Sequence, residues 1–257
     1  MRTRHLAVLA FFSLAMALTI FIVIPKAPAK ELSAQEILDY VDDLYRGKSS
    51  QGRMTMTIVT AQWKRSLSIE FWAKGKENSL MRITAPAKEK GTATLRVGND
   101  MYNYLPKVKR TIKLPSSMMS ASWMGSHFTN DDLVKESRFT DDFTFKITGR
   151  STEGGAPVAE ITCIPKPDAA VVWGKVVVYA RISDYIPLRS LYYDEDGKLA
   201  RTMAFSELGK TGDRMIPKVL TITPQDKPKE MTVVRYDDIR YDVKLADDLF
   251  SLRTLEK

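Results

Sequence analysis

The side chains that most often transfer protons or hold metals near neutral pH are scarce in this sequence. His5 and His127 are the only histidines among 257 residues, and Cys163 is the only cysteine. So few imidazoles and thiols cannot complete a multi-histidine or cysteine-rich metal centre. The sequence also lacks a nucleophile elbow, a phosphate-cradling loop and a dinucleotide fingerprint. We therefore predict no catalytic residue, no metal site and no cofactor, and we expect that the chain is not an enzyme.

Adjacent aspartates are the remaining candidates for acid–base chemistry. They occur at positions 42–43, 131–132, 141–142, 237–238 and 247–248. Adjacent residues of a strand point to opposite faces, whereas paired catalytic carboxylates must face one another. We interpret these pairs as helix starts and solvated turns. Cys163 is predicted to be a small buried residue of a strand. His127 is a lone base or a pH-sensitive contact or, more simply, a surface or lid side chain without a catalytic task.

Methionine and aromatic side chains offer a different chemistry, which is the binding of apolar partners of variable shape. Several lie on predicted strands, and others gather in residues 115–138, where a polar loop would be the default. The candidate residues for an apolar ligand are Met54, Met56, Ile69, Phe71, Leu95, Met118, Met119, Trp123, Met124, Met203 and Phe205. The alternative is that these side chains only fill a packed core.

A strip of cations follows Pro106 and consists of Lys107, Lys109, Arg110 and Lys113. Such a strip can be a solvated strand edge that resists aggregation. Its functional interpretation is partner docking, either to acidic lipid headgroups or to an acidic surface of a transporter. No run of cations interleaved with aromatic residues supports a nucleic-acid groove, so we expect no nucleic-acid partner.

Alternation of apolar and polar side chains, which is typical of strands, runs through most of the chain. It is clearest in Met54–Ile58 and Leu67–Ala73, and a second series extends from Phe143 to Arg240. Closely spaced strands joined by short turns form antiparallel meanders, because parallel strands need long crossovers. The sequence therefore predicts a mainly β (α+β) fold. Roughly a dozen antiparallel strands are too many for a flat sheet, so we expect a strongly curved sheet or a barrel.

Two helical segments interrupt the strands. Residues 32–44 have apolar side chains at helical spacing, and Ser33 with Glu36 forms a capping-box pattern. Thr129 is a plausible N-cap for a short helix that begins at Asn130. This second helix belongs to residues 115–138, an insertion with its own apolar side chains, which predicts a lid or plug.

The N-terminus has the order of a secretory signal. A basic segment (residues 2–5) precedes an apolar run (6–24) and the small-residue end Ala27-Pro28-Ala29. We predict a signal peptide of residues 1–29 and a single domain of residues 30–257. The apolar run is long enough to span a bilayer, so an uncleaved membrane anchor is the alternative. Cleavage would lower the net charge from +8 to +5, which leaves the chain mildly basic.

Three stretches, Lys90–Thr92, Gly98–Pro106 and Met124–Leu133, resemble the bacterial outer-membrane lipoprotein-sorting protein family, a relative of the periplasmic lipoprotein carriers. The resemblance spans nearly the whole chain after residue 29. It implies an incomplete, strongly curved β-barrel, with helices covering its open concave face and an apolar cavity for acyl chains. It also implies periplasmic residence and association with exporters of the resistance-nodulation-division type. His127 stands where the family usually has an acid.

These features favour a periplasmic carrier that binds acyl chains of a lipid or lipoprotein and makes transient membrane contact. The candidate residues above would be lipid-binding residues. The alternative is an accessory subunit that docks on an inner-membrane exporter and carries no cargo. An enzyme that acts on lipids is a third and weaker hypothesis.

Overall fold

The computed structural model describes residues 32–135, 139–169 and 171–257. Residues 32–257 form one compact unit. The predicted signal peptide lies outside the described residues. Within the described part, we find no helix with both the length and the apolar character needed to cross a membrane.

A single antiparallel sheet of 13 strands dominates the described residues. Its spatial order is β6-β5-β4-β3-β2-β1-β13-β12-β11-β10-β9-β8-β7. The strands are β1 (Ser49–Val59), β2 (Lys64–Lys74), β3 (Asn78–Ala85), β4 (Ala93–Val97), β5 (Asp100–Leu105), β6 (Arg110–Lys113), β7 (Phe143–Glu153), β8 (Ala156–Pro165), β9 (Lys175–Arg181), β10 (Pro187–Tyr193), β11 (Leu199–Thr211), β12 (Arg214–Pro224) and β13 (Met231–Tyr241). The predicted fold class, a mainly β fold of roughly a dozen antiparallel strands, is confirmed.

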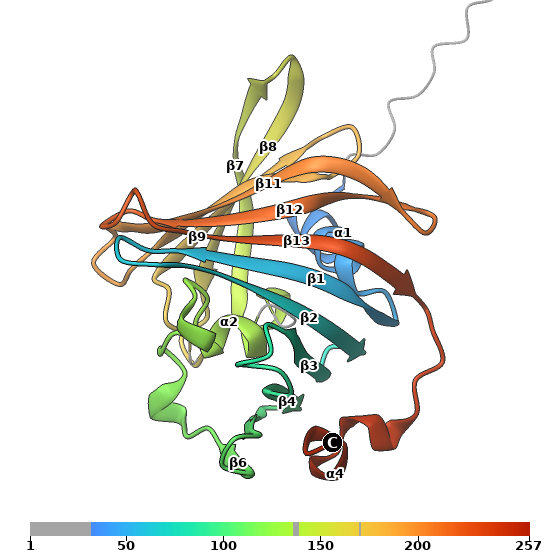
Figure 1. Cartoon of the computed structure of the whole chain (residues 1–257). Helices are drawn as coiled ribbons and strands as arrows, with labels where there is room; N and C mark the ends of the chain where they lie inside the picture. Colours follow the sequence, from blue (N-terminus) through green and yellow to red (C-terminus); the bar gives the residue numbers. More distant parts are fainter. Residues whose placement is uncertain (1–31, 136–138, 170) are drawn as a thin grey trace, which may run out of the picture. The chain divides into compact units, whose positions relative to one another are not determined.

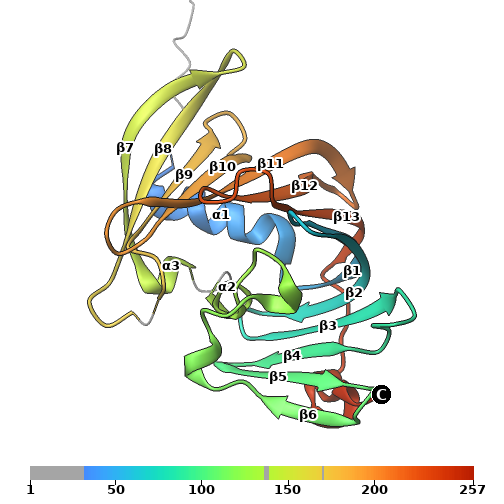
Figure 2. The ribbon, with the colours of Figure 1, turned by 60° about the vertical axis from the view of Figure 1, so that its left-hand side comes forward.

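The order of the strands shows how the sheet is assembled. The first six strands form one meander and the last seven form another, and pairing of β1 with β13 joins the two. The free edges are therefore β6 and β7, which are neighbours in the sequence. Figures 1 and 2 show that the sheet curves strongly without closing. This is the incomplete barrel implied by the family resemblance, and the segment from β6 to β7 has to connect its two open edges.

Alternation explains which side chains enter the concave side. In β2, Leu67, Ile69 and Phe71 are buried, whereas Ser66 and Ser68 are exposed. The register of β1 shifts just after Gly52, at a bulge between Arg53 and Met54. A Cβ atom at Gly52 would lie 2.1 Å from the Asp238 carbonyl oxygen, so no larger residue fits there. From this bulge onward Met54 and Met56 face the core.

Helix α1 (Ala34–Arg46) lies across the concave side of the sheet, as Figure 2 shows. Its predicted capping box is confirmed, since Ser33 Oγ accepts the Glu36 N–H and the Glu36 carboxylate accepts the Ser33 N–H. Ile37 and Leu38 pack on the apolar faces of β8 and β9. Burial of this helical face fills one half of the concave side.

The segment between the free edges, called the insertion below (residues 114–135 as described), begins after β6. It contains η1 (Ser116–Met118), η2 (Trp123–Gly125) and α2 (Asn130–Lys135), and α3 (Phe139–Asp142) precedes β7. The predicted cap is confirmed. The Asp132 N–H donates to Thr129 Oγ1 at 3.1 Å, and the Thr129 N–H donates to Asp132 Oδ2 at 2.7 Å.

The C-terminus covers part of the opposite, outer face, which was not predicted from the sequence. It contains η4 (Asp247–Phe250) and α4 (Leu252–Leu255). Phe250 and Leu255 pack with Leu80 and Leu95 in a separate apolar cluster. Leu95 was predicted to line an inner cavity; instead it points outward, because its neighbours Thr94 and Arg96 occupy the inward positions of β4. Apolar side chains on both faces of the sheet therefore reflect helices on both faces.

Candidate functional site

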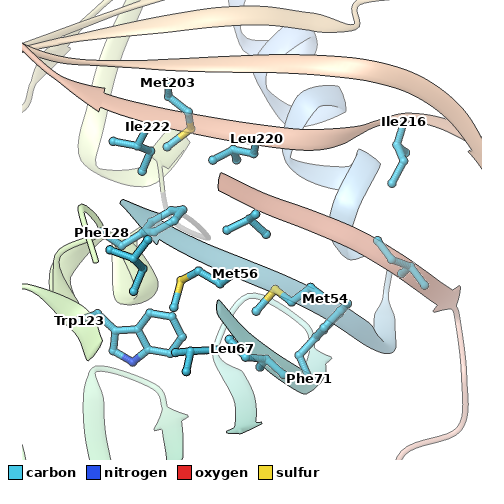
Figure 3. Packing of buried hydrophobic residues seen from close by; sticks show 14 of the residues in the cluster. Met54, Met56, Leu67, Phe71, Trp123, Phe128, Met203, Ile216, Leu220 and Ile222 are labelled. Atoms are coloured by element: carbon cyan, nitrogen blue, oxygen red, sulfur yellow. The ribbon is translucent and has the colours of Figure 1, made fainter. Parts of the chain in front are cut away.

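Sequence-distant apolar side chains converge inside the curved sheet. Met54 and Met56 from β1 and Phe71 from β2 belong to one cluster with Trp123 and Phe128 of the insertion. Figure 3 shows Trp123 and Phe128 beside Met56 at one end of this cluster. The Trp123 indole N–H donates to Thr94 Oγ1 at 3.0 Å, which fixes the ring against the sheet. The insertion thus contributes buried side chains to the core.

Two adjoining cavities lie between α1, the insertion and the sheet. The first has a volume of about 120 Å³ and the second about 130 Å³. Three residues line both: Tyr45 and Arg46 from the end of α1, and Phe128 from the insertion. The two cavities are therefore compartments of one interior, divided by a wall from α1 and the insertion.

Most of the lining is apolar and flexible. Of the predicted ligand residues, Met54, Met56, Phe71 and Trp123 line the first cavity. Met203 and Phe205 line the second, together with Trp173 and Tyr192. Methionine adapts its shape at low cost, so both compartments suit ligands of variable shape.

The other predicted ligand residues do not line either cavity. Ile69 is buried in the core beside the first cavity, and Met124 packs partly buried against that core. Met119 packs against Met101 of β5 and Leu114 at the start of the insertion, and the Met118 side chain is 43% exposed. The sequence placed these residues near the interior, but η1 turns Met118 outward. The structure therefore brings together six of the eleven predicted side chains at the cavities.

The dividing wall is held by Tyr45. Its hydroxyl donates to the Pro217 carbonyl oxygen at 2.9 Å, and its ring lies 5.3 Å from Tyr236 and 6.5 Å from Phe205. Arg46, the second wall residue, is held within α1 by Asp42 at 3.0 Å. The wall therefore places two aromatic rings, those of Tyr45 and Phe128, and one ion pair between two mainly apolar compartments.

A buried ion pair beneath the second cavity was missed by the sequence analysis. Arg201 of β11 reaches Asp132 of α2 through two hydrogen bonds of 2.7 and 2.6 Å, and it also donates to the His127 carbonyl oxygen at 3.1 Å. Its guanidinium lies 4.3 Å from the ring centres of Trp173 and Tyr192. The aspartates at 131 and 132 were interpreted as a helix start; they do begin a helix, and both are buried.

His127 is half-buried and tied to the sheet. Its Nδ1 lies 2.8 Å from Thr232 Oγ1, and its Nε2 lies 3.3 Å from Glu230 Oε2. The Ala61 N–H also donates to Glu230 at 3.2 Å. These contacts, that of Ala61 first, hold the pKa of the Glu230 carboxyl below its usual value. Through these contacts His127 links the insertion to the β12–β13 turn and the start of β13.

The predicted docking strip lies on the hairpin of β5 and β6, at a free edge of the sheet. Lys107, Lys109 and Arg110 are exposed. Lys113 differs, because it pairs with Asp100 at 2.8 Å, and this hydrogen bond raises the pKa of Lys113. An exposed basic edge fits both the protective and the docking interpretation.

The described residues contain no cluster of three His, Cys, Asp or Glu side chains that could hold a metal ion.

Residues 75–257 match a family described as "uncharacterized protein". Among solved structures, a DUF1329 family protein from Desulfovibrio piger is 22% identical, with a TM-score of 0.79 over 86% of this chain and 97% of that one. A putative outer membrane lipoprotein-sorting protein domain from Vibrio parahaemolyticus is 23% identical, with a TM-score of 0.75 over 87% and 98%.

A LolA superfamily protein from Nitrosomonas europaea is also 23% identical, with a TM-score of 0.74 over 87% of this chain and 99% of that one. Among curated proteins, none has significant sequence similarity to this chain. The resemblance drawn from the sequence is confirmed at the level of the fold.

Proposed function

The chain belongs to the family of uncharacterized proteins that its residues 75–257 match, and from this premise and its fold we propose that it is a non-enzymatic carrier of acyl chains. The cargo would be a lipid or a lipoprotein, bound inside the curved sheet and passed between membranes or to or from an exporter. Solved proteins of the same fold include a putative lipoprotein-sorting domain, which supports this proposal.

The observation that carries the proposal is the pair of adjoining cavities. Both are lined mainly by apolar side chains, and they share Tyr45 and Phe128 as a common wall. Removal of apolar surface from water stabilises a bound acyl chain by about 0.8 kcal/mol per buried methylene. Two compartments on either side of one wall suit cargo with more than one chain.

The place of action that we propose is the periplasm. The signal-like N-terminus would direct export, with residues 1–29 removed and residues 30–257 acting as one domain. The charged residues that line the two cavities are Asp42, Arg46, Arg96, Asp131 and Asp132, and the proposal assigns no catalytic chemistry to them. A carrier needs no such chemistry, since binding and release suffice.

A substitution that fills a cavity tests the proposal. Ser79 lines the first cavity, and Ser68 lies exposed on the outer face of the neighbouring strand. Ser79→Phe should lower uptake of a fluorescent acyl probe at least about 10-fold, equivalent to 1.4 kcal/mol. Ser68→Phe is the matched control and should leave uptake unchanged. Equal uptake by both variants would refute binding in the first cavity.

The second candidate function is an accessory subunit that docks on an exporter without cargo. The exposed cations Lys107, Lys109 and Arg110 on an edge hairpin favour it, because they suit an acidic docking surface. Crosslinking in cells separates the two functions. A protein that crosslinks to an exporter through this hairpin and takes up no acyl probe would be the accessory subunit.

A further inference from the structure

We propose that three turns at one end of the sheet form a docking surface for anionic phospholipid bilayers. The docking surface consists of Trp63, Lys64, Lys88, Lys90, Lys227 and Lys229. It adjoins the cationic hairpin of β5 and β6, because a Cβ atom at Gly91 of the β3–β4 turn would lie 3.5 Å from Pro106 Cγ. The inference goes beyond carriage, because it holds whether or not the cavities take acyl chains.

Two contacts bring the three turns together. The Ala61 N–H, in the β1–β2 turn, donates to Glu230 at the start of β13 at 3.2 Å. Arg65, just after the same turn, pairs with Glu89 of the β3–β4 turn at 3.1 Å. Figures 1 and 2 both show the β1–β2 and β12–β13 turns side by side. Segments far apart in the sequence thus form one continuous end surface.

The acidic and basic side chains of this surface differ in whether they form ion pairs or hydrogen bonds. Its two glutamates are engaged, Glu89 by Arg65 and Glu230 by Ala61 and His127. The five lysines are exposed, and none of them forms an ion pair with a described residue. Asp226 is the remaining acid of the three turns. The surface therefore presents a net positive charge, and this attracts an anionic bilayer.

Trp63 adds the apolar component. Its side chain is 43% exposed at the tip of the β1–β2 hairpin, and the Arg65 guanidinium lies 5.3 Å from its ring centre. An amphipathic tryptophan ring takes up the headgroup level of a bilayer. An exposed tryptophan on one of three turns that carry exposed lysines fits the flat, anionic face of a membrane. The separate, flexible lysines lack the fixed fork geometry that selects one protein carboxylate.

The docking surface adjoins the insertion that lines both cavities. Arg65 Nη2 donates to the Met124 carbonyl oxygen, and His127 contacts both Glu230 and Thr232. Phe128, the next residue, belongs to the wall between the cavities. A bilayer bound here would therefore lie next to the element that closes the proposed cargo site.

Vesicle binding tests the proposal with the full-length chain. Co-sedimentation compares vesicles of phosphatidylcholine with vesicles of equal parts phosphatidylcholine and phosphatidylglycerol. The chain should prefer the anionic vesicles, and the preference should weaken with salt. The triple variant Lys64→Gln, Lys227→Gln, Lys229→Gln should lose at least about 10-fold in anionic-vesicle affinity. The control Lys48→Gln, Lys210→Gln, Lys244→Gln removes the same charge from exposed lysines at the opposite end of the sheet and should lose much less.

Fluorescence quenching tests the role of Trp63 separately. It remains informative even if the N-terminal apolar segment makes every variant co-sediment with vesicles. Brominated lipid should quench the fluorescence of the wild-type chain, and Trp63→Ala should remove most of that quenching. Met215→Ala, which changes an exposed apolar side chain at the opposite end of the sheet, should leave quenching unchanged. Equal losses in the two triple variants, or quenching that survives Trp63→Ala, would overturn the proposal. Ser79→Phe should retain vesicle binding, so failure of carriage and failure of docking are distinguishable.

Discussion

Arg201 and Asp132 form a buried, bidentate ion pair that joins the sheet to the insertion. Their side chains are 5% and 9% exposed, and the two hydrogen bonds measure 2.7 and 2.6 Å. Trp173 and Tyr192 lie against the guanidinium at 4.3 Å each. The pair therefore holds α2 over the second cavity, and removing one partner would leave a charge buried beneath it.

Breaking this pair should cost much stability. Asp132→Ala should lower the free energy of unfolding by about 3–5 kcal/mol, because Arg201 would remain buried without its carboxylate. Replacing both partners, Arg201→Met with Asp132→Leu, should recover most of the loss. Denaturant titration measures both values. The exposed pair of Arg235 and Glu207 is the control, and Glu207→Ala should have a far smaller effect. A small effect of Asp132→Ala would show that the pair does not hold the insertion.

Glu230 should make part of the stability depend on acid pH. The Ala61 N–H and His127 depress its pKa in the folded state, so the contribution is complete above the unfolded value of about 4.5. It is lost as the pH falls through the folded pKa. Melting temperatures between pH 3 and 6 should therefore fall less steeply for Glu230→Gln than for the wild type. Asp226→Asn removes one charge from the same turn and serves as the control; an identical effect of both variants would contradict the assignment.

Cys163 should be inert in the folded chain. It is fully buried on β8, and burial raises its pKa to about 12. Because the folded state keeps this proton while the unfolded thiol loses it above about pH 9, stability should fall as the pH rises through that range. A thiol reagent at pH 8 should react only after unfolding, with a rate that follows denaturant concentration. Rapid, stoichiometric labelling of the native chain would be inconsistent with this burial.

Leu95 should matter for stability and not for ligand uptake. It packs on Phe250 and Leu255 at the outer face. Leu95→Ala should lower the free energy of unfolding by about 2–5 kcal/mol through the cavity it creates. Uptake of an acyl probe at a temperature where the variant stays folded should match the wild type. Val97→Ala, on the exposed end of the same strand, controls for the substitution. Reduced uptake by folded Leu95→Ala would place this residue functionally at the inner site.

Local features were predictable because they depend on near neighbours in the sequence. The capping box of Ser33–Glu36 follows from a three-residue spacing and Thr129 was predicted as an N-cap; the structure confirms both and adds the return bond from the Thr129 N–H to Asp132. Strand alternation likewise gave the buried set Leu67, Ile69 and Phe71. The number of strands and their short turns then indicated a curved antiparallel sheet.

Features that depend on distant pairing were not predictable. Alternation assigns Leu95 to one side of β4 but cannot tell which side faces the interior, and the covering C-terminal helix carried no clear pattern. Asp132 meets Arg201 across 69 positions of sequence, so an aspartate that begins a helix gave no sign of burial. The docking surface of Trp63 and five lysines also comes from three separate turns.

Native mass spectrometry of the gently purified protein tests the proposal of carriage most directly. The account predicts that a fraction of the protein carries bound lipid or lipid-modified cargo. It also predicts that cargo-free protein takes up lipid on mixing, and that Ser79→Phe carries less. Repeatedly cargo-free protein that takes up no lipid on mixing, in a chain shown to be folded, would contradict the account.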